Sequence, residues 1–339
     1  MKFTVLFTAC AGILSCAQSG NTSHQPIKFT GNTKRIQFDT TLYSIAWSNG
    51  HIIAAQNNGK LLILDSNYQR QATLETRLNK DHLSRLFCLH DTVFIVAKNT
   101  RYYLDTGMNW QVDNDHPLKE DRTLLWDDDT WSVSECCMGE FGGSVFFVNK
   151  KTNKTWSYPA TCASQVMKYK NGYWICNNLA HLGRHTSYTL IPDPEKTYDV
   201  TDTMQKSCNW WATIDSIENR RTLQAAATRG IKTIAAPDQS MTAQAFVYHD
   251  SLYAVLSNNK STCIAVLKQD SMVVRDTIFR HPINFHYTQT IQAGEKTISL
   301  LNLTGGSPVE AYFFTGNSSA IMVTNGTNID LLLNKIKSQ

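Results

Sequence analysis

The sequence predicts an all-β fold in which one small sheet is repeated along the chain. Turn signals between short apolar strands recur about every forty residues, a period typical of β-propeller blades. Thr, Ser, Asn, Tyr and Trp are abundant and helical patterning is scarce, which favours strands. The turns are Asn49-Gly50, His90-Asp91, the Asp127–Asp129 run, Asn171-Gly172, His249-Asp250 and Ala293-Gly294.

The period predicts one propeller domain over residues 27–330, with seven four-stranded blades. Six of the units can be read directly, because apolar runs lie on both sides of each turn. Their expected strands are Leu42–Trp47, His51–Ala55 and Leu61–Leu64; Leu86–Leu89, Val93–Ala97 and Tyr102–Leu104; Leu124–Trp126, Trp131–Val133, Val145–Val148 and Thr155–Tyr158; Val166–Tyr169, Tyr173–Cys176 and Tyr188–Ile191; Phe246–Tyr248, Leu252–Leu256, Cys263–Leu267 and Val273–Thr277; and Tyr287–Ile291, Ile298–Leu301 and Ala311–Phe314.

One more blade is expected between the fourth and fifth turns, because that interval is about twice the others. Its strands are predicted at Trp210–Ile214, Arg221–Thr228 and Ile231–Ala236. The alternative for part of this stretch is an Ala-rich helix across Ser216–Thr228. The ring must also close, and Arg35–Phe38 is expected to be the outer strand of the last blade.

The units resemble tryptophan–aspartate-repeat and YVTN-type propellers in their length and strand order. They lack a fixed Gly-His or Trp-Asp signature. The resemblance is therefore to an architecture and not to one family. The alternative fold for the same strand pattern is a pair of two-sheet β-sandwiches.

The N-terminus predicts export. Lys2 supplies a positive start, and the apolar run Phe3–Leu14 is too short to span a bilayer. The segment Ile13-Leu14-Ser15-Cys16 resembles a Bacteroidota-type lipoprotein signal, although the usual box has its Leu three residues before the Cys. The resemblance implies a signal peptide over residues 1–15, lipidation of Cys16, a polar tether over residues 16–26 and attachment to the outer membrane, facing the periplasm or the cell surface. The alternative is an ordinary secretory signal in which Cys16 is incidental.

Composition excludes some classes of partner. Charged residues make up 18% of the chain and the formal net charge is +4. No basic block is available to neutralise phosphates, so nucleic-acid binding is not expected. Seven Cys follow Cys16, which predicts at least one unpaired thiol, and none of their spacings suits zinc. Neither a metal nor a cofactor is predicted.

Uneven connections predict where a ligand binds. Most turns between second and third strands are tight, whereas Ser134–Ser144 and Asn177–Thr186 are expected to be long loops over one mouth of the channel. The candidate binding residues there and at the nearby blade junction are Glu135, Glu140, His181, Arg184, His185, Trp210 and Trp211.

Two catalytic interpretations of these residues are weak. The spacing His181-x-x-x-His185 lacks the Glu of a zinc protease motif, and Gly183 disfavours a helix there. A pair such as Glu135 and Glu140 is what a glycosidase requires, but the sequence does not fix the separation of the carboxylates.

The functional hypothesis is a monomeric, lipid-anchored propeller of the cell envelope that binds a protein or glycan without catalysis. One alternative is a glycan-active hydrolase or lyase on the same scaffold. Another is an outer-membrane assembly scaffold, which would use the sheet edges and one face of the ring.

Overall fold

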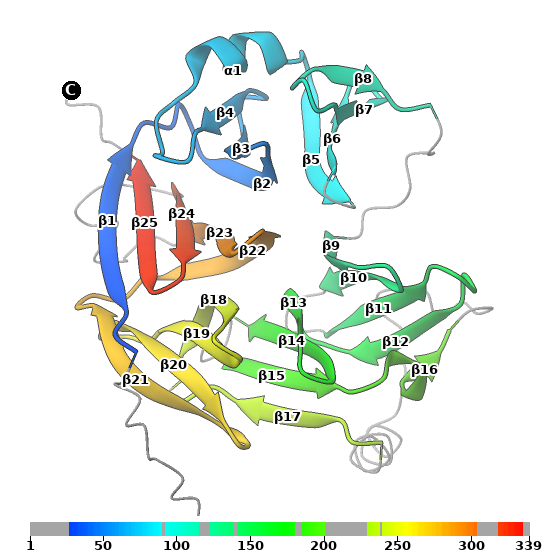
Figure 1. The fold of residues 1–339 in the computed structure, drawn as a ribbon, viewed down its shortest axis with the longest axis vertical. Helices are drawn as coiled ribbons and strands as arrows, with labels where there is room; N and C mark the ends of the chain where they lie inside the picture. Colours follow the sequence, from blue (N-terminus) through cyan, green and yellow to red (C-terminus); the bar gives the residue numbers. More distant parts are fainter. Residues whose placement is uncertain are drawn as a thin grey trace, which may run out of the picture.

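The computed structural model describes residues 27–89, 92–114, 123–137, 142–179, 185–200, 229–237, 239–303 and 318–334. Within these ranges the chain is a β-propeller: six sheets follow one another around a common centre (Figure 1). Neighbouring strands within each blade are antiparallel, except for the parallel pair β1 and β25, and the first strand of each blade lies innermost. The all-β prediction is confirmed.

The blades are made of short strands joined by tight turns. Blade 1 contains β2 (Leu42–Ser48), β3 (His51–Gln56) and β4 (Leu61–Leu64). Blade 2 contains β5 (Leu83–Leu89), β6 (Thr92–Ala97), β7 (Thr100–Leu104) and β8 (Trp110–Val112). Blade 3 contains β9 (Thr123–Asp127), β10 (Trp131–Cys137), β11 (Gly143–Asn149), β12 (Thr155–Pro159) and β16 (Tyr198–Asp199). Blade 4 contains β13 (Ala163–Tyr169), β14 (Gly172–Leu179), β15 (His185–Ile191) and β17 (Lys232–Ala235). Blade 5 contains β18 (Met241–Tyr248), β19 (Ser251–Ser257), β20 (Thr262–Lys268) and β21 (Ser271–Phe279). Blade 6 contains β22 (Phe285–Ala293), β23 (Lys296–Leu303), β24 (Ser318–Asn325), β25 (Asn328–Asn334) and β1 (Thr30–Ile36).

The prediction of seven blades is wrong, because the long interval between the fourth and fifth turns, Asn171-Gly172 and His249-Asp250, spans one blade and not two. Strand β17 pairs with β15, with Tyr188 opposite Ile234, so Ile231–Ala236 supplies the outer strand of blade 4. A long insertion between the third and fourth strands of one blade therefore separates the two turns. Residues 201–228, with the strands expected at Trp210–Ile214 and Arg221–Thr228, lie outside the described residues.

The two connections expected to be long are shorter than predicted. Strand pairing continues to Cys137 opposite Gly143 and to Leu179 opposite His185, so both hairpins extend further than the apolar runs suggested. The last blade differs as well. The run Ala311–Phe314 lies outside the described residues, and the third strand of that blade is β24.

The ring closes through β1, as predicted, although the strand is Thr30–Ile36 and not Arg35–Phe38. It pairs in parallel with β25 and becomes the fifth strand of blade 6. Asp330 on β25 accepts hydrogen bonds from Lys34 at 3.1 Å and from Tyr68 of blade 1 at 2.9 Å. This carboxylate therefore links the N-terminal strand, the last blade and the first.

Blade 1 has three strands, and helix α1 (Ala72–Leu78) covers its outer edge in place of a fourth. The Glu75 carboxylate accepts from the backbone N–H of Ile63 at 3.1 Å, and the Asn79 side chain accepts from the N–H of Leu61 at 2.7 Å. Arg70 bridges Glu75 and Asp39 through charged hydrogen bonds of 2.7 to 2.9 Å. Side chains of the helix thus satisfy the backbone of β4.

Polar side chains on the inner strands join successive blades. Five inner strands are bulged near their start, and Ser44, Arg85, Gln165 and Gln244 directly follow the bulge. Gln165 of blade 4 bonds both the N–H and the carbonyl of Ala245 in blade 5. In blade 1, the Ser44 hydroxyl donates to the Leu86 carbonyl of blade 2. The residue that follows the bulge in blade 2 is Arg85.

The apolar core lies between the blades and is unevenly distributed. Buried clusters span the junctions of blades 1 and 2, 3 and 4, 4 and 5, 5 and 6, and 6 and 1. Among the described residues no such cluster joins blades 2 and 3. A disulfide, Cys137–Cys162, ties blade 3 to blade 4, while Cys88, Cys176 and Cys263 are not part of a disulfide. No described helix is long and apolar enough to cross a membrane.

Candidate functional site

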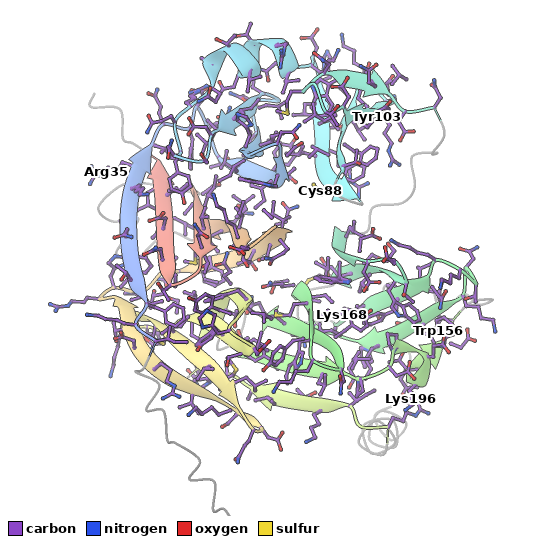
Figure 2. All side chains as sticks on the ribbon, viewed as in Figure 1. Arg35, Cys88, Tyr103, Trp156, Lys168 and Lys196 are labelled. Atoms are coloured by element: carbon purple, nitrogen blue, oxygen red, sulfur yellow. A yellow bond between two sulfur atoms is a disulfide. The ribbon has the colours of Figure 1, made fainter. Side chains whose placement is uncertain are left out.

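Three adjoining cavities lie along the inner strands of the ring. Their volumes are about 200, 420 and 350 Å³. Cys88 on β5 and Ile291 on β22 line all three, so the cavities meet near the centre of the ring. Figure 2 shows Cys88 on β5 and Lys168 on β13 close to that centre, whereas Tyr103 and Trp156 lie further out in their blades. We call this space the channel.

The smallest cavity lies at the end of the channel where the inner strands are bulged. Tyr43, Ser84, Arg85 and Phe87 line it. The Tyr43 hydroxyl is buried and has no hydrogen-bond partner among the described residues, and burial raises its pKa. This end combines an aromatic wall with a guanidinium group.

Behind this cavity, blade 2 presents a cationic aromatic face. Phe87 stacks on Phe94 with ring centroids 5.4 Å apart, and the Arg101 guanidinium lies 4.3 Å from the Phe94 centroid. Burial lowers the pKa of Arg101, although Asp113, 2.8 Å away, opposes this. A charged face of this kind distinguishes blade 2 from the apolar faces at the other junctions.

The two larger cavities reach the opposite end, beside the hairpin turns that follow the inner strands, and the larger of them also extends to Gln165 near the start of β13. We call this end of the channel the turn end. Trp47 and Asn49 of blade 1 line one of them, and Trp126 and Asp127 of blade 3 line the other. Gln292 of blade 6 borders both. Asp127 is the one charged side chain among the described residues that line these two cavities, and it pairs with Lys150 at 2.9 Å.

Asp128, next to this wall, fixes the turn after β9. Its carboxylate accepts from the Trp126 indole at 3.1 Å, the Tyr173 hydroxyl at 2.8 Å and the backbone N–H of Trp131 at 2.8 Å. Burial alone would raise the pKa of Asp128, but these donors outweigh burial and hold the pKa well below its usual value. The network orients the Trp126 ring and ties blade 3 to blade 4.

Replacing Asp128 by Asn is expected to lower the free energy of unfolding at pH 7 by about 2 kcal/mol, the scale of hydrogen bonds to a charged group. Because the folded pKa of Asp128 is depressed, its stabilisation is complete above the unfolded pKa, near 3.8, and is lost as the pH falls below that value. Urea unfolding at pH 7, 5 and 3 measures this. The gap between the parent and the variant should shrink toward pH 3, and Asp129→Asn, at an exposed neighbour, should leave stability unchanged. An equal gap at all three pH values would contradict the assignment.

Of the predicted binding residues, only Glu135 and His185 fall within the described ranges, and neither is among the residues that line the three cavities. Glu135 is buried in β10, opposite Val145, and is not among the residues that line the three cavities. His185 begins β15, where it pairs with Leu179. Glu140, His181, Arg184, Trp210, Trp211 and the predicted lipidation site Cys16 lie outside the described residues. No three His, Cys, Asp or Glu side chains within the described ranges are placed to hold a metal ion.

Sequence reasoning missed the residues at the turn end. The sequence predicts Trp47 only as the end of a strand, Leu42–Trp47, and Asp127 only as part of the Asp127–Asp129 turn. Their position in the sequence could have indicated that these residues border the channel. Trp47, Cys88 and Trp126 each lie one or two residues before the first turn of their blade. On an inner strand such residues border the channel.

The fold and the channel together define the chain as a six-bladed β-propeller with ligand-sized cavities along its centre. No protein-family profile and no curated protein matches the sequence. Solved structures with a similar fold include a luciferin-regenerating enzyme, 10% identical over 86% of this chain and 95% of that chain, with a TM-score of 0.45. The β-propeller domain of the Trilobed protease from Pyrococcus furiosus is 9% identical over 84% and 95%, with a TM-score of 0.37. The N-terminal domain of Nup159 is 9% identical over 92% and 89%, with a TM-score of 0.38.

Proposed function

We propose that this chain is a lipid-anchored propeller of the cell envelope that binds a protein or glycan and does not catalyse its conversion. The observation that carries the proposal is the composition of the channel wall. Aliphatic side chains, one Trp in each cavity and neutral polar groups line the two larger cavities, and the single carboxylate described there, Asp127, is paired with Lys150. Glycoside hydrolysis needs two carboxyl groups across a cleft, so this wall supports binding.

The rigidity of the ring also supports a binding role. Inner strands are joined by buried polar side chains, so residues that border the channel are held by their neighbours before a ligand arrives. A preformed site avoids the entropy cost of ordering on binding. The anchor completes the proposal: lipidation at Cys16 and a tether over residues 16–26 would place the ring at the membrane surface.

Capture of partners from envelope extract tests the binding role. The bait is a soluble form that begins at residue 20, and the control bait carries Trp47→Ala and Trp126→Ala. We expect the parent to retain an envelope protein or glycan that the control bait loses, with circular dichroism confirming that the control is folded. Equal recovery by both baits would contradict binding through the channel.

Metabolic labelling with a lipid precursor tests the anchor independently. The parent should incorporate the label and Cys16→Ala should not. An unlabelled parent would remove the anchor from the proposal and leave the binding role to be judged by the capture experiment.

A further inference from the structure

We infer that the turn end of the channel binds a neutral sugar ring, with the Trp126 indole as the stacking platform. This inference rests on the proposed binding function and narrows it to a glycan. It also moves the site from the predicted mouth loops to the other end of the channel. Four properties of the turn end support it: aromatic surface, neutral polar groups, balance of charge and size.

The aromatic surface comes from two blades. Trp47 and Trp126 are partly buried, and each borders one of two cavities that share Cys88, Ile291, Gln292 and Gly294. The Trp126 N–H is bound by Asp128 at 3.1 Å, so the ring is fixed in orientation. Lys296 lies 5.3 Å from the Trp47 ring centroid and occupies part of that ring's surroundings. Trp126 is therefore the better platform for the apolar C–H face of a sugar.

Hydrogen-bonding groups surround the rings. Asn49 and Gln292 supply amides and Ser48 supplies a hydroxyl, while the buried Thr290 hydroxyl is bonded to Ser299 at 2.8 Å. Gln292 donates one hydrogen bond to the Gly294 carbonyl at 2.7 Å, and its amide keeps a second N–H. Amides and hydroxyls both donate and accept, which matches the hydroxyl groups of a sugar.

The one charged side chain described in the lining of these cavities is paired, so we expect a neutral ligand. Asp127 is paired with Lys150 at 2.9 Å, and no Lys, Arg or His is among the described residues that line the two cavities. No described lining residue of these two cavities is a cation, in contrast to Arg85 at the bulged end. The cations beside them are engaged, Lys150 with Asp127 and Lys296 with the Trp47 ring. A cationic ligand would have to displace Lys150 from Asp127.

The size also fits a short saccharide. The two cavities measure about 420 and 350 Å³ and share four lining residues. Small-molecule sites in proteins are typically about 300 to 1,000 Å³ and combine aromatic walls with a few polar groups. The shared wall lets a saccharide extend from Trp126 toward Trp47.

Titration calorimetry and tryptophan fluorescence of the purified full chain test this inference with defined probes. The neutral probes are maltotriose, cellotriose and chitotriose, and the charged probe is trigalacturonic acid. We expect at least one neutral trisaccharide to bind and to change tryptophan emission, and the acid to bind at least tenfold more weakly. Failure of all three neutral probes, or tighter binding of the acid, would overturn the inference.

Variants then locate the site. Trp126→Ala is expected to weaken binding at least tenfold, Trp126→Phe to restore part of it, and Gln292→Ala, at an exposed side chain, to weaken it several-fold. The matched control is Trp110→Phe, because Trp110 bonds the Leu78 carbonyl far from the channel lining. Unchanged affinity in folded Trp126→Ala would overturn the assignment.

The outcome is separable from that of the proposed function. A protein partner captured from envelope extract together with no saccharide binding would reject the sugar site and keep the binding module. Loss of both would reject both.

Discussion

Replacing Gln244 by Leu is expected to lower the free energy of unfolding by about 3 kcal/mol, because the change leaves several buried polar groups without partners. Gln244 is 1% exposed on β18. Its amide donates to the Thr297 carbonyl at 2.9 Å and to the Ser299 hydroxyl at 3.0 Å, and its carbonyl accepts from Thr324. Leu has a similar volume, so the loss reports hydrogen bonding more than packing.

Urea unfolding followed by tryptophan fluorescence measures this change. Gln69→Leu is the matched control, because Gln69 is exposed and makes only a local contact with the Asn67 carbonyl. The control should change stability by less than about 0.5 kcal/mol. Equal losses in the two variants would mean that the bonds from blade 5 to blade 6 contribute little.

Glu75→Ala is expected to destabilise the protein by about 3 kcal/mol, since it removes the acceptor for a strand N–H and the partner of a charged side chain. Glu75 is 6% exposed, whereas the Arg70 side chain is 31% exposed and can turn to solvent, which limits the loss. Glu75→Gln keeps an acceptor for Ile63 and should lose less. The Ala variant also uncovers the edge of β4, so it should aggregate faster on heating.

Thermal unfolding and light scattering measure both parts of this prediction. Thr76→Ala, at the next residue of α1, is the control, because its hydroxyl bonds only within the helix. If Glu75→Ala behaves like Thr76→Ala, the helix does not act as the missing strand of blade 1.

The sequence predicts the repeat and most of the strands, because turn chemistry and strand alternation are local properties. Trp131–Val133 and Val145–Val148, for example, lie within β10 and β11. The number of blades is not local. Ile231–Ala236 has the same strand character whether it begins a new blade or completes blade 4, and only its pairing with β15 decides.

One local signal in the sequence would have sharpened the blade pattern. The segments Asp65–Gln71 and Asp105–Gln111 form the same turn after the third strand in blades 1 and 2. In each, the Asp carboxylate accepts from a backbone N–H four residues later and from a Gln amide six residues later. Tyr68 and Met108 take positive φ values at the same place in the two turns.

The candidate site was less predictable than the fold. The binding site is predicted from the length of two loops, and most of the candidate residues in and beside those loops lie outside the described ranges. The channel residues belong to strands, where alternation normally separates core from solvent. Bulges in the inner strands change that alternation, so side-chain alternation alone does not indicate that Trp47 and Trp126 border a cavity.

The parallel pairing of β1 has a mechanical consequence. In a chain held by a lipid at Cys16, as proposed, tension enters the ring at Phe29, which is buried in the core between blades 5 and 6, and passes directly to β1. All seven residues of that strand are paired with β25, and Asn32 and Lys34 also bond Asp330. A force along β1 acts on all of its pairings with β25 at once, in shear, and does not break them one after another. The tether should therefore extend fully before the ring yields.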